Sequence, residues 1–296
     1  MKRLPCFSLL VLICSFLIMN TALANVVWKE IAVDGNYGKL YQPSSVKVVS
    51  ATNGVATLIR ATIKTTYNLE AAQETIAGYE IGNIIADPSK LAYSVADVEI
   101  NPQNRTIRYA KEDFYDTTDK VIWSAEPREP KEVHKERIFE EDYYATIVDA
   151  VFHQGERERC KAGDRWRTLW QETEKDGSTA VSMADTSTMR QRGENTLIFW
   201  EWIEKKTLAG QTTEVQFLKK AVRLNDGTQK IIEGKKWTPQ TPKWVTVASS
   251  GVYEKIPTKG AKAGGLQFLR AYHKGYQYWL NRYRTDKIVK LPAKNK

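Results

Sequence analysis

The chain has 296 residues, a formal net charge of +9, and a composition that is 42% hydrophobic, 27% charged and 10% aromatic. This is the composition of a folded globular protein, so disorder, collagen and coiled coil are excluded as descriptions of the whole chain. After the first 24 residues no apolar run approaches the length of about 18 residues that a transmembrane helix needs.

The first 24 residues have the three parts of a secretory signal peptide. Lys2 and Arg3 provide the positive start, residues 7–19 form the apolar centre, and Ala22-Leu23-Ala24 offers small residues to a signal peptidase. We therefore expect cleavage after Ala24 and export to the periplasm, the cell surface or the medium.

The rest of the chain contains a weak internal repeat. Trp28 precedes the triplet Thr57-Leu58-Ile59 by 29 residues, and Trp166 precedes Thr196-Leu197-Ile198 by 30 residues. Each half then has alternating apolar and polar residues around a turn, which predicts one hairpin at 93–109 and another at 215–232. Because the order of these features is the same in both halves, we interpret the chain as two homologous units.

An apolar period of 3.6 residues ends each half. It predicts a helix over 131–152 in the first half and another from about 264 to 284 in the second. A short helical or loop stretch is expected earlier in the first half, at 69–76. In this interpretation His134 lies on a solvated helix face. The predicted fold class is α+β: two tandem units, each an antiparallel β-sheet of hairpins packed by a C-terminal helix.

These patterns divide the mature chain into a first unit at 25–153, a linker at 154–164 and a second unit at 165–296. The linker is a charged run that contains Cys160, the one cysteine that the leader does not remove. No intramolecular disulfide is therefore expected. The flanking cations predict a lowered pKa for this thiol, although an unreactive linker cysteine is the favoured interpretation.

Charge separates the two units. Residues 25–150 have 14 Lys and Arg against 20 Asp and Glu, a net charge of −6, whereas residues 151–296 have 28 against 15, a net charge of +13. Such asymmetry concerns partners rather than fold. Either the acidic unit docks on the basic one, in the same chain or in a neighbour, or the basic unit faces an anionic polymer.

No motif in the sequence names a reaction. The three histidines do not cluster, and the sequence has no Cys-x-x-Cys pair, nucleophile elbow or phosphate loop, so neither a metal nor a cofactor is expected. Two carboxylate runs, Glu112-Asp113 and Glu140-Glu141-Asp142, leave open a hydrolase of cell-wall material that acts through a carboxylate pair.

The tryptophans and lysines of the second half indicate a function more clearly than the carboxylate runs do. Seven of the nine tryptophans lie at or after Trp166. Trp200 and Trp202 are expected on one face of a strand, where core packing is the favoured role. Exposed indoles can stack on sugar rings while nearby lysines meet phosphate, sulfate or carboxylate groups. The candidate ligand-binding residues are Trp237, Trp244, Lys235, Lys236, Lys274, Arg282 and Arg284.

One stretch of the first unit resembles a known family. Residues 97–109 read Asp-Val-Glu-Ile-Asn-Pro-Gln-Asn-Arg-Thr-Ile-Arg-Tyr, and Phe114-Tyr115-Asp116 and Lys120-Val121-Ile122-Trp123 follow. This pattern resembles the bacterial surface-adhesin protein E-like domain family, and the segment that starts at Trp28 is similar to its beginning. The similarity would cover 26–152, with a more diverged copy at 164–284.

The resemblance implies exported α+β domains that act by binding at the cell envelope or surface, without a cofactor. Two departures are visible: the cysteine pair common in the family is missing, and Asp119 stands where a turn glycine is usual. No binding residues carry over from the family.

We therefore expect an exported, non-enzymatic, adhesin-like binding protein whose partner is an anionic envelope polymer or another protein. Nucleic acid is not expected as a partner, because the chain is exported. The alternatives are a cell-envelope hydrolase and a structural periplasmic assembly subunit whose acidic and basic units associate.

Overall fold

The computed structural model describes residues 26–52, 55–134 and 138–283. Within these ranges, no helix combines the length and the apolar character that spanning a membrane requires. The predicted signal peptide with its cleavage site lies outside the described residues, and so does Arg284.

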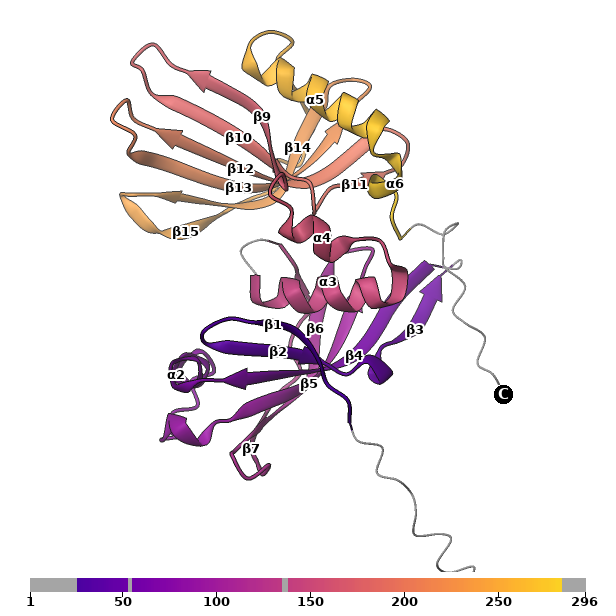
Figure 1. Cartoon of the computed structure of the whole chain (residues 1–296). Coiled ribbons are helices and arrows are strands. Elements are labelled where there is room, and N and C mark those ends of the chain that lie inside the picture. The colour runs from indigo at the N-terminus through magenta and orange to yellow at the C-terminus, as the bar shows by residue number, and fades with distance from the viewer. Residues whose placement is uncertain (1–25, 53–54, 135–137, 284–296) are drawn as a thin grey trace, which may run out of the picture.

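The first unit is an eight-stranded antiparallel sheet (Figure 1). Its main path runs through β1 (Lys29–Val33), β2 (Tyr37–Tyr41), β4 (Val55–Tyr67), β5 (Tyr93–Asn101), β6 (Thr106–Tyr115) and β7 (Val121–Ala125). Two further strands, β3 (Lys47–Thr52) and β8 (Lys131–Glu132), pair with the first residues of β4 and β6. Short 3-10 helices at Pro43–Ser45 and Pro88–Lys90 lie in the connections.

The second unit has the same arrangement. Its path runs through β9 (Trp166–Thr173), β10 (Thr179–Asp185), β12 (Thr196–Lys206), β13 (Thr212–Arg223), β14 (Thr228–Thr238) and β15 (Thr241–Val247). Here β11 (Arg190–Arg192) and β16 (Glu254–Lys255) pair with the starts of β12 and β14. Two tandem antiparallel units are thus confirmed, and the predicted hairpins are β5–β6 and β13–β14.

The two sheets also share their irregularities. One bulge falls at Ile31 in β1 and at the equivalent Leu169 in β9, and both bulged side chains are buried. Another falls at Ala110 in β6 and at Ile232 in β14. Because a bulge bends a strand and increases its twist, the shared positions give both sheets the same curvature and support an internal duplication.

Strand register corrects one detail of the sequence alignment. Ile59 pairs with Ile100, one residue before the β5–β6 turn, and Leu197 pairs with Val222, one residue before the β13–β14 turn. The structural equivalent of Ile59 is therefore Leu197, so the two Thr-Leu-Ile triplets lie one residue out of register.

The helices differ from the predicted ones mainly at their ends. α2 (Leu69–Gly78) links β4 to β5, α3 (Ile138–Phe152) ends the first unit, and α5 (Ala261–Gly275) with α6 (Gln277–Leu280) ends the second. α3 starts later than predicted because Lys131–Glu132 pair with β6. The predicted solvated position of His134 is wrong: its side chain is buried, and its ring lies 4.7 Å from that of Trp200.

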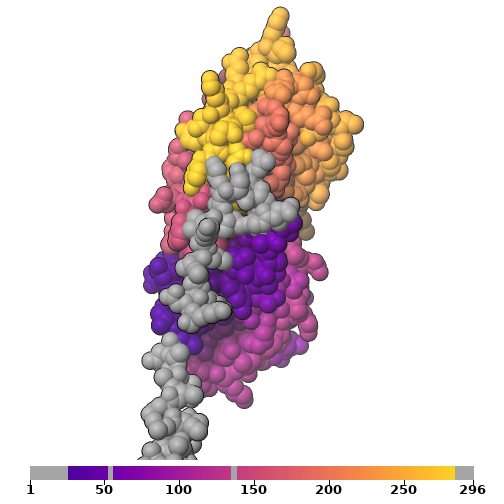
Figure 2. All heavy atoms as spheres, turned by 90° about the vertical axis from the view of Figure 1, so that its right-hand side faces the viewer, coloured from indigo at the N-terminus to yellow at the C-terminus, as the bar shows by residue number. Residues whose placement is uncertain are grey.

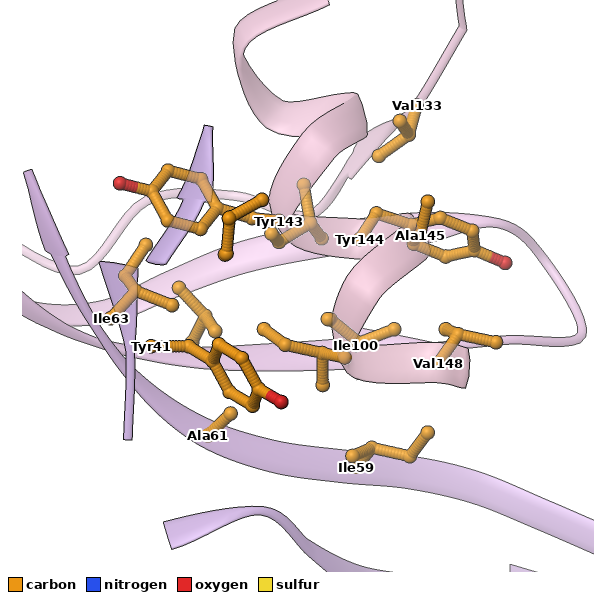
Figure 3. Close-up of a cluster of buried hydrophobic side chains, with 14 of the residues drawn as sticks. Tyr41, Ile59, Ala61, Ile63, Ile100, Val133, Tyr143, Tyr144, Ala145 and Val148 are labelled. Carbon is orange, nitrogen blue, oxygen red and sulfur yellow. The ribbon is translucent and has the colours of Figure 1, made fainter. Parts of the chain in front are cut away.

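The core of the first unit lies between α3 and the sheet (Figure 3). Tyr143, Tyr144 and Val148 of α3 pack toward Ile59 and Ile100, and all five side chains are fully buried. Each such side chain contributes about 1.5–3 kcal/mol through burial of apolar surface. In the second unit a similar cluster combines Leu197, Phe199, Val222, Leu269 and Tyr272.

The two units are stacked, with α3 and α4 (Glu156–Lys161) between the sheets (Figure 1). In the space-filling view they form two lobes, the N-terminal half below and the C-terminal half above (Figure 2). The segment predicted as a linker therefore contains a helix at the junction of the units. Asp149 of α3 caps this helix by accepting hydrogen bonds from the N–H groups of Glu156 and Arg157, both at 2.8 Å.

Seven charged side chains are buried where the units meet, and we call them the interface ion cluster. Each is 7% exposed or less, and the members are Arg105, Glu141, Glu156, Arg165, Asp185, Arg190 and Arg282. Arg105, Glu141 and Glu156 come from elements before the second unit, and the other four come from the second unit. The cluster therefore joins segments that are far apart in the sequence.

Glu141 and Glu156 each bridge the two units. Glu141 accepts hydrogen bonds from Arg165 at 2.6 and 2.8 Å and from Arg105 at 2.9 Å. Glu156 accepts hydrogen bonds from Arg282 at 2.9 Å and from the Tyr283 hydroxyl at 2.8 Å, and it also pairs with Arg105. Burial alone would lower the pKa of Arg105, but Glu156 and the other anionic neighbours hold it well above its ordinary value.

The backbone of Arg105 reflects its role in this cluster. Its φ is +56°, in the left-handed region that a non-glycine residue rarely adopts, and the equivalent turn position of the second unit is Gly227 with φ +61°. The two positions are equivalent, because each carbonyl accepts the corresponding backbone hydrogen bond: the Arg105 carbonyl from the Val133 N–H, and the Gly227 carbonyl from the Ile256 N–H. The first unit accepts this strained backbone at the position from which the side chain reaches Glu141 and Glu156.

We expect Glu156→Gln to destabilise the protein strongly, because the buried Arg282 would lose its carboxylate partner and the buried Arg105 would keep only Glu141, which it shares with Arg165. The expected loss in the free energy of unfolding is about 3 kcal/mol, measured by urea denaturation. Glu158→Gln is the matched control, since Glu158 lies on the same helix and is exposed. Equal stability of the two variants would contradict this account of the junction.

Candidate functional site

An aromatic band crosses one face of the second sheet. It consists of Trp166 in β9, Trp200 and Trp202 in β12, Phe217 in β13, Trp237 in β14 and Trp244 in β15. The Phe217 ring is the centre: it stacks on Trp200 with ring centroids 4.4 Å apart, and the centroids of Trp202 and Trp166 lie 6.1 and 6.4 Å away. As predicted, Trp200 and Trp202 share a face.

The inner end of the band is covered by the first unit. The His134 ring lies 5.1 Å from Phe217, and the Trp200 indole N–H donates to Glu132 at 3.1 Å. Glu132 also pairs with Lys219 of β13. Trp200 is accordingly buried and belongs to the packing between the units, which agrees with the core role favoured from the sequence.

The outer end of the band is open. Trp244 is 40% exposed and its ring meets Trp202 edge to face at 6.2 Å. Trp237 is half-buried, and its indole N–H donates to the Pro242 carbonyl at 3.2 Å. Six of the seven residues of β15 are exposed, so this strand presents the end of the band at the edge of the sheet. We call Trp202, Trp237 and Trp244 with Lys235 the band edge.

Two neighbouring lysine candidates lie on opposite faces of the sheet. Lys235 pairs with Phe217 in the ladder and so shares the face of the band, whereas Lys236 points the other way and pairs with Glu214. Burial of Glu214 raises its pKa, but hydrogen bonds from Lys205, Lys236 and Gln216 outweigh this and lower the pKa to about 2. Lys236 is therefore held by a permanent carboxylate partner.

The remaining candidates do not join this surface. Lys274 is exposed in the last turn of α5, and Arg282 is buried in the interface ion cluster, where it is held by Glu156 and by the Ser187 carbonyl at 2.6 Å. The structure thus brings together Trp237, Trp244 and Lys235 of the predicted set. Sequence reasoning missed Trp202 at this surface, although its alternation with Trp200 and the lysines after it was the available signal.

The carboxylate runs occupy structural positions. Glu112 and Asp113 are consecutive in β6 and point to opposite faces: Glu112 is buried and accepts a hydrogen bond from Ser94 at 3.0 Å, whereas Asp113 pairs with Lys111 at 2.6 Å. Glu141 belongs to the interface ion cluster, and Asp142 pairs with Lys39 at 3.0 Å. Over the described ranges no group of three His, Cys, Asp or Glu could hold a metal ion.

A proposal for the function of this chain rests on its fold and on the geometry described above. No protein-family model and no curated protein matches the sequence. The resemblance to the surface-adhesin family therefore stays an expectation from the sequence.

Cys160 has a different environment from the one its neighbours in the sequence suggest. It lies on α4 beside Arg105, and burial raises its pKa to about 12, an effect that Arg105 opposes and that Glu156 and Glu141 reinforce. The predicted lowering of its pKa by flanking cations is therefore wrong, because burial of the thiol outweighs the effect of nearby positive charge.

We expect the Cys160 thiol to stay protonated between pH 7 and 9 in the folded protein. Its reaction with iodoacetamide at about pH 8 should be at least about a hundredfold slower than that of a cysteine-containing peptide. The rate should rise only as the pH approaches the pKa, or when urea unfolds the chain. A folded-state rate equal to that of the peptide would show that the thiol is not shielded.

Proposed function

We propose that the chain is an exported, non-enzymatic binding protein of the cell envelope or surface that holds an anionic polysaccharide at the band edge. The observation that carries the proposal is the difference between the two ends of the aromatic band: the first unit covers Trp200 at the inner end, whereas Trp244 at the outer end is 40% exposed.

The chemistry of the band edge suits a charged sugar chain. Exposed indoles stack on the apolar faces of sugar rings, and a cation on the same face can pair with the carboxylate or sulfate groups of the polymer. The surrounding unit is strongly basic by sequence, with 28 Lys and Arg against 15 Asp and Glu over residues 151–296. This excess would attract an anionic polymer over distances comparable to the Debye length.

The ion pairs across the junction account for part of the charge asymmetry. Glu132, Glu141 and Glu156 bind cations of the second unit, so some acidic charge of the N-terminal half is used for docking within the chain. Lys235 lies outside this junction, on the face of the open indoles. This difference favours the band edge over the junction as the place where an external partner binds.

The test is binding to polygalacturonate, a linear chain of sugar carboxylates, with neutral dextran for comparison. We expect the mature protein to bind polygalacturonate in co-sedimentation at about 50 mM salt and to be released at about 500 mM, as the Debye length falls from roughly 14 Å to 4 Å. Trp244→Ala and Lys235→Ala should each weaken binding by about tenfold, because each removes one of the few groups that contact the polymer.

Matched controls separate the site from general charge. Tyr278→Ala removes an aromatic side chain that is 58% exposed on α6, and Lys274→Ala removes an exposed cation from α5, and both should bind as the unmodified protein does. If Trp244→Ala binds equally well, the contact is unspecific attraction and the assignment of the site fails. If the unmodified protein does not bind at low salt, the assignment of an anionic polysaccharide fails.

A further inference from the structure

A second feature of the basic unit lies on the opposite face of the same sheet. A cavity of about 230 Å³ separates α5 from the strands, with apolar walls that include Trp170, Leu266 and Leu269. Its polar lining residues are Glu201, Lys205, Gln216, Lys220, Gln229 and Lys262. Of these six, Glu201 and Lys220 are buried, and buried charged side chains are unusual in the interior of a small sheet-and-helix unit.

The positions of the first unit that are equivalent to three of these polar residues hold aliphatic core residues. The shared ladder register makes Ile63 equivalent to Glu201, because the two residues pair with the equivalent Ala96 and Leu218. By the same register Val98 is equivalent to Lys220, and Ile107 to Gln229. The three aliphatic side chains of the first unit are at most 2% exposed. The second unit has therefore replaced a layer of aliphatic core with a carboxylate, an ammonium and an amide.

The ladder does not require these replacements. Lys220 and Glu201 form an ion pair that is almost entirely buried, and the Ser182 hydroxyl donates to Glu201. A buried ion pair is often no more stable than a packed apolar pair of similar volume, since both charges lose their water. Because the first unit builds the same ladder with aliphatic residues, the polar layer points to a role other than stability.

The helix above the cavity also carries smaller side chains near its start than its counterpart carries in the first core. α3 fills the first core with Tyr143 and Tyr144, both fully buried, whereas α5 begins with Gly264 and Gly265 in its second turn. A Cβ atom at Gly265 would lie 3.3 Å from the Leu169 carbonyl oxygen and 3.2 Å from the Trp170 ring. The helix therefore approaches β9 closely through glycine, and the space beside it stays open.

One cation at the cavity differs from the others. Lys220 is neutralised by Glu201, and Lys205 pairs with Glu214 at 2.8 Å. Lys262 is exposed and has no carboxylate partner within the described ranges; its ammonium lies 5.4 Å from the centre of the Trp170 ring. An unpaired cation beside an indole, next to apolar walls, matches a ligand with one anionic end and an apolar body.

We propose that this cavity binds a small organic carboxylate. The carboxylate group pairs with Lys262, the apolar body lies against Trp170, Leu266 and Leu269, and any polar substituent reaches the Glu201–Lys220 pair. This site is independent of the band edge, since Glu201 and Trp202 are consecutive and point to opposite faces of β12.

The test uses 4-phenylbutyrate and its uncharged amide as probes, with binding to the mature protein measured by calorimetric titration and by saturation-transfer NMR. We expect the carboxylate to bind with a dissociation constant about tenfold lower than that of the amide, as one charge-assisted hydrogen bond would give. Lys262→Ala should remove this preference. Lys274→Ala, an exposed cation farther along the same helix, should keep it.

A second variant moves the core of the first unit into the second: Glu201→Ile combined with Lys220→Val and Gln229→Ile. We expect this variant to unfold at the same temperature as the unmodified protein or at a higher one, because it replaces a buried ion pair with apolar side chains. It should keep the preference for the carboxylate, since Lys262, Trp170, Leu266 and Leu269 are unchanged and 4-phenylbutyrate has no polar substituent that reaches the replaced residues. The proposal is overturned if the unmodified protein binds neither probe or does not distinguish them, if Lys262→Ala keeps the preference, or if the folded triple variant loses it. None of these results bears on binding at the band edge.

Discussion

The carboxylate of Glu156 holds the two units together. It has no exposure to solvent, it is part of the short helix between the units, and it binds Arg105 on one side and Arg282 with Tyr283 on the other. A buried carboxylate is stable only when cations and hydrogen-bond donors replace its water. Its presence therefore requires those partners at fixed positions, and these positions determine how α4, the last helical turn and the β5–β6 turn meet. The strained backbone of Arg105 is one cost of that arrangement.

Much of the fold could be predicted from the sequence, since hairpins and helices have local patterns. The turn at Asn225-Asp226-Gly227 and the apolar alternation around it predicted the hairpin β13–β14, although β14 continues past the predicted end at Ile232 to Thr238. The interface ion cluster could not be predicted in this way. Glu141 and Glu156 stand in runs of charged residues that are typical of solvated surfaces, and only three-dimensional contacts with Arg165 and Arg282 distinguish them. For the same reason Arg282 resembled a surface cation, and Trp202 resembled a core residue rather than part of an open surface.

The two units have the same strand pairing but differ in the side chains that line their interiors. Shared bulges at Ile31 and Leu169 give both sheets the same bend, while side-chain changes put a polar-lined cavity below α5 at positions that are aliphatic core in the first unit. The α2 helix covers one end of the first sheet with its own small apolar cluster, whereas the equivalent connection of the second sheet is a turn between β12 and β13. Both candidate binding regions, the band edge and the cavity, belong to the second unit.

The shared cluster at the junction also bears on cooperativity. If the second unit unfolded alone, Glu141 and Glu156 would lose Arg165, Arg190 and Arg282, and the first unit would be left with two carboxylates and Arg105 newly facing water. If the first unit unfolded alone, Trp200 would lose the cover of His134 and Glu132. Either partial state gives up contacts of the unit that stays folded. The two sheets are thereby coupled into one folding unit, in which local unfolding of the first half weakens the packing around the candidate binding regions of the second.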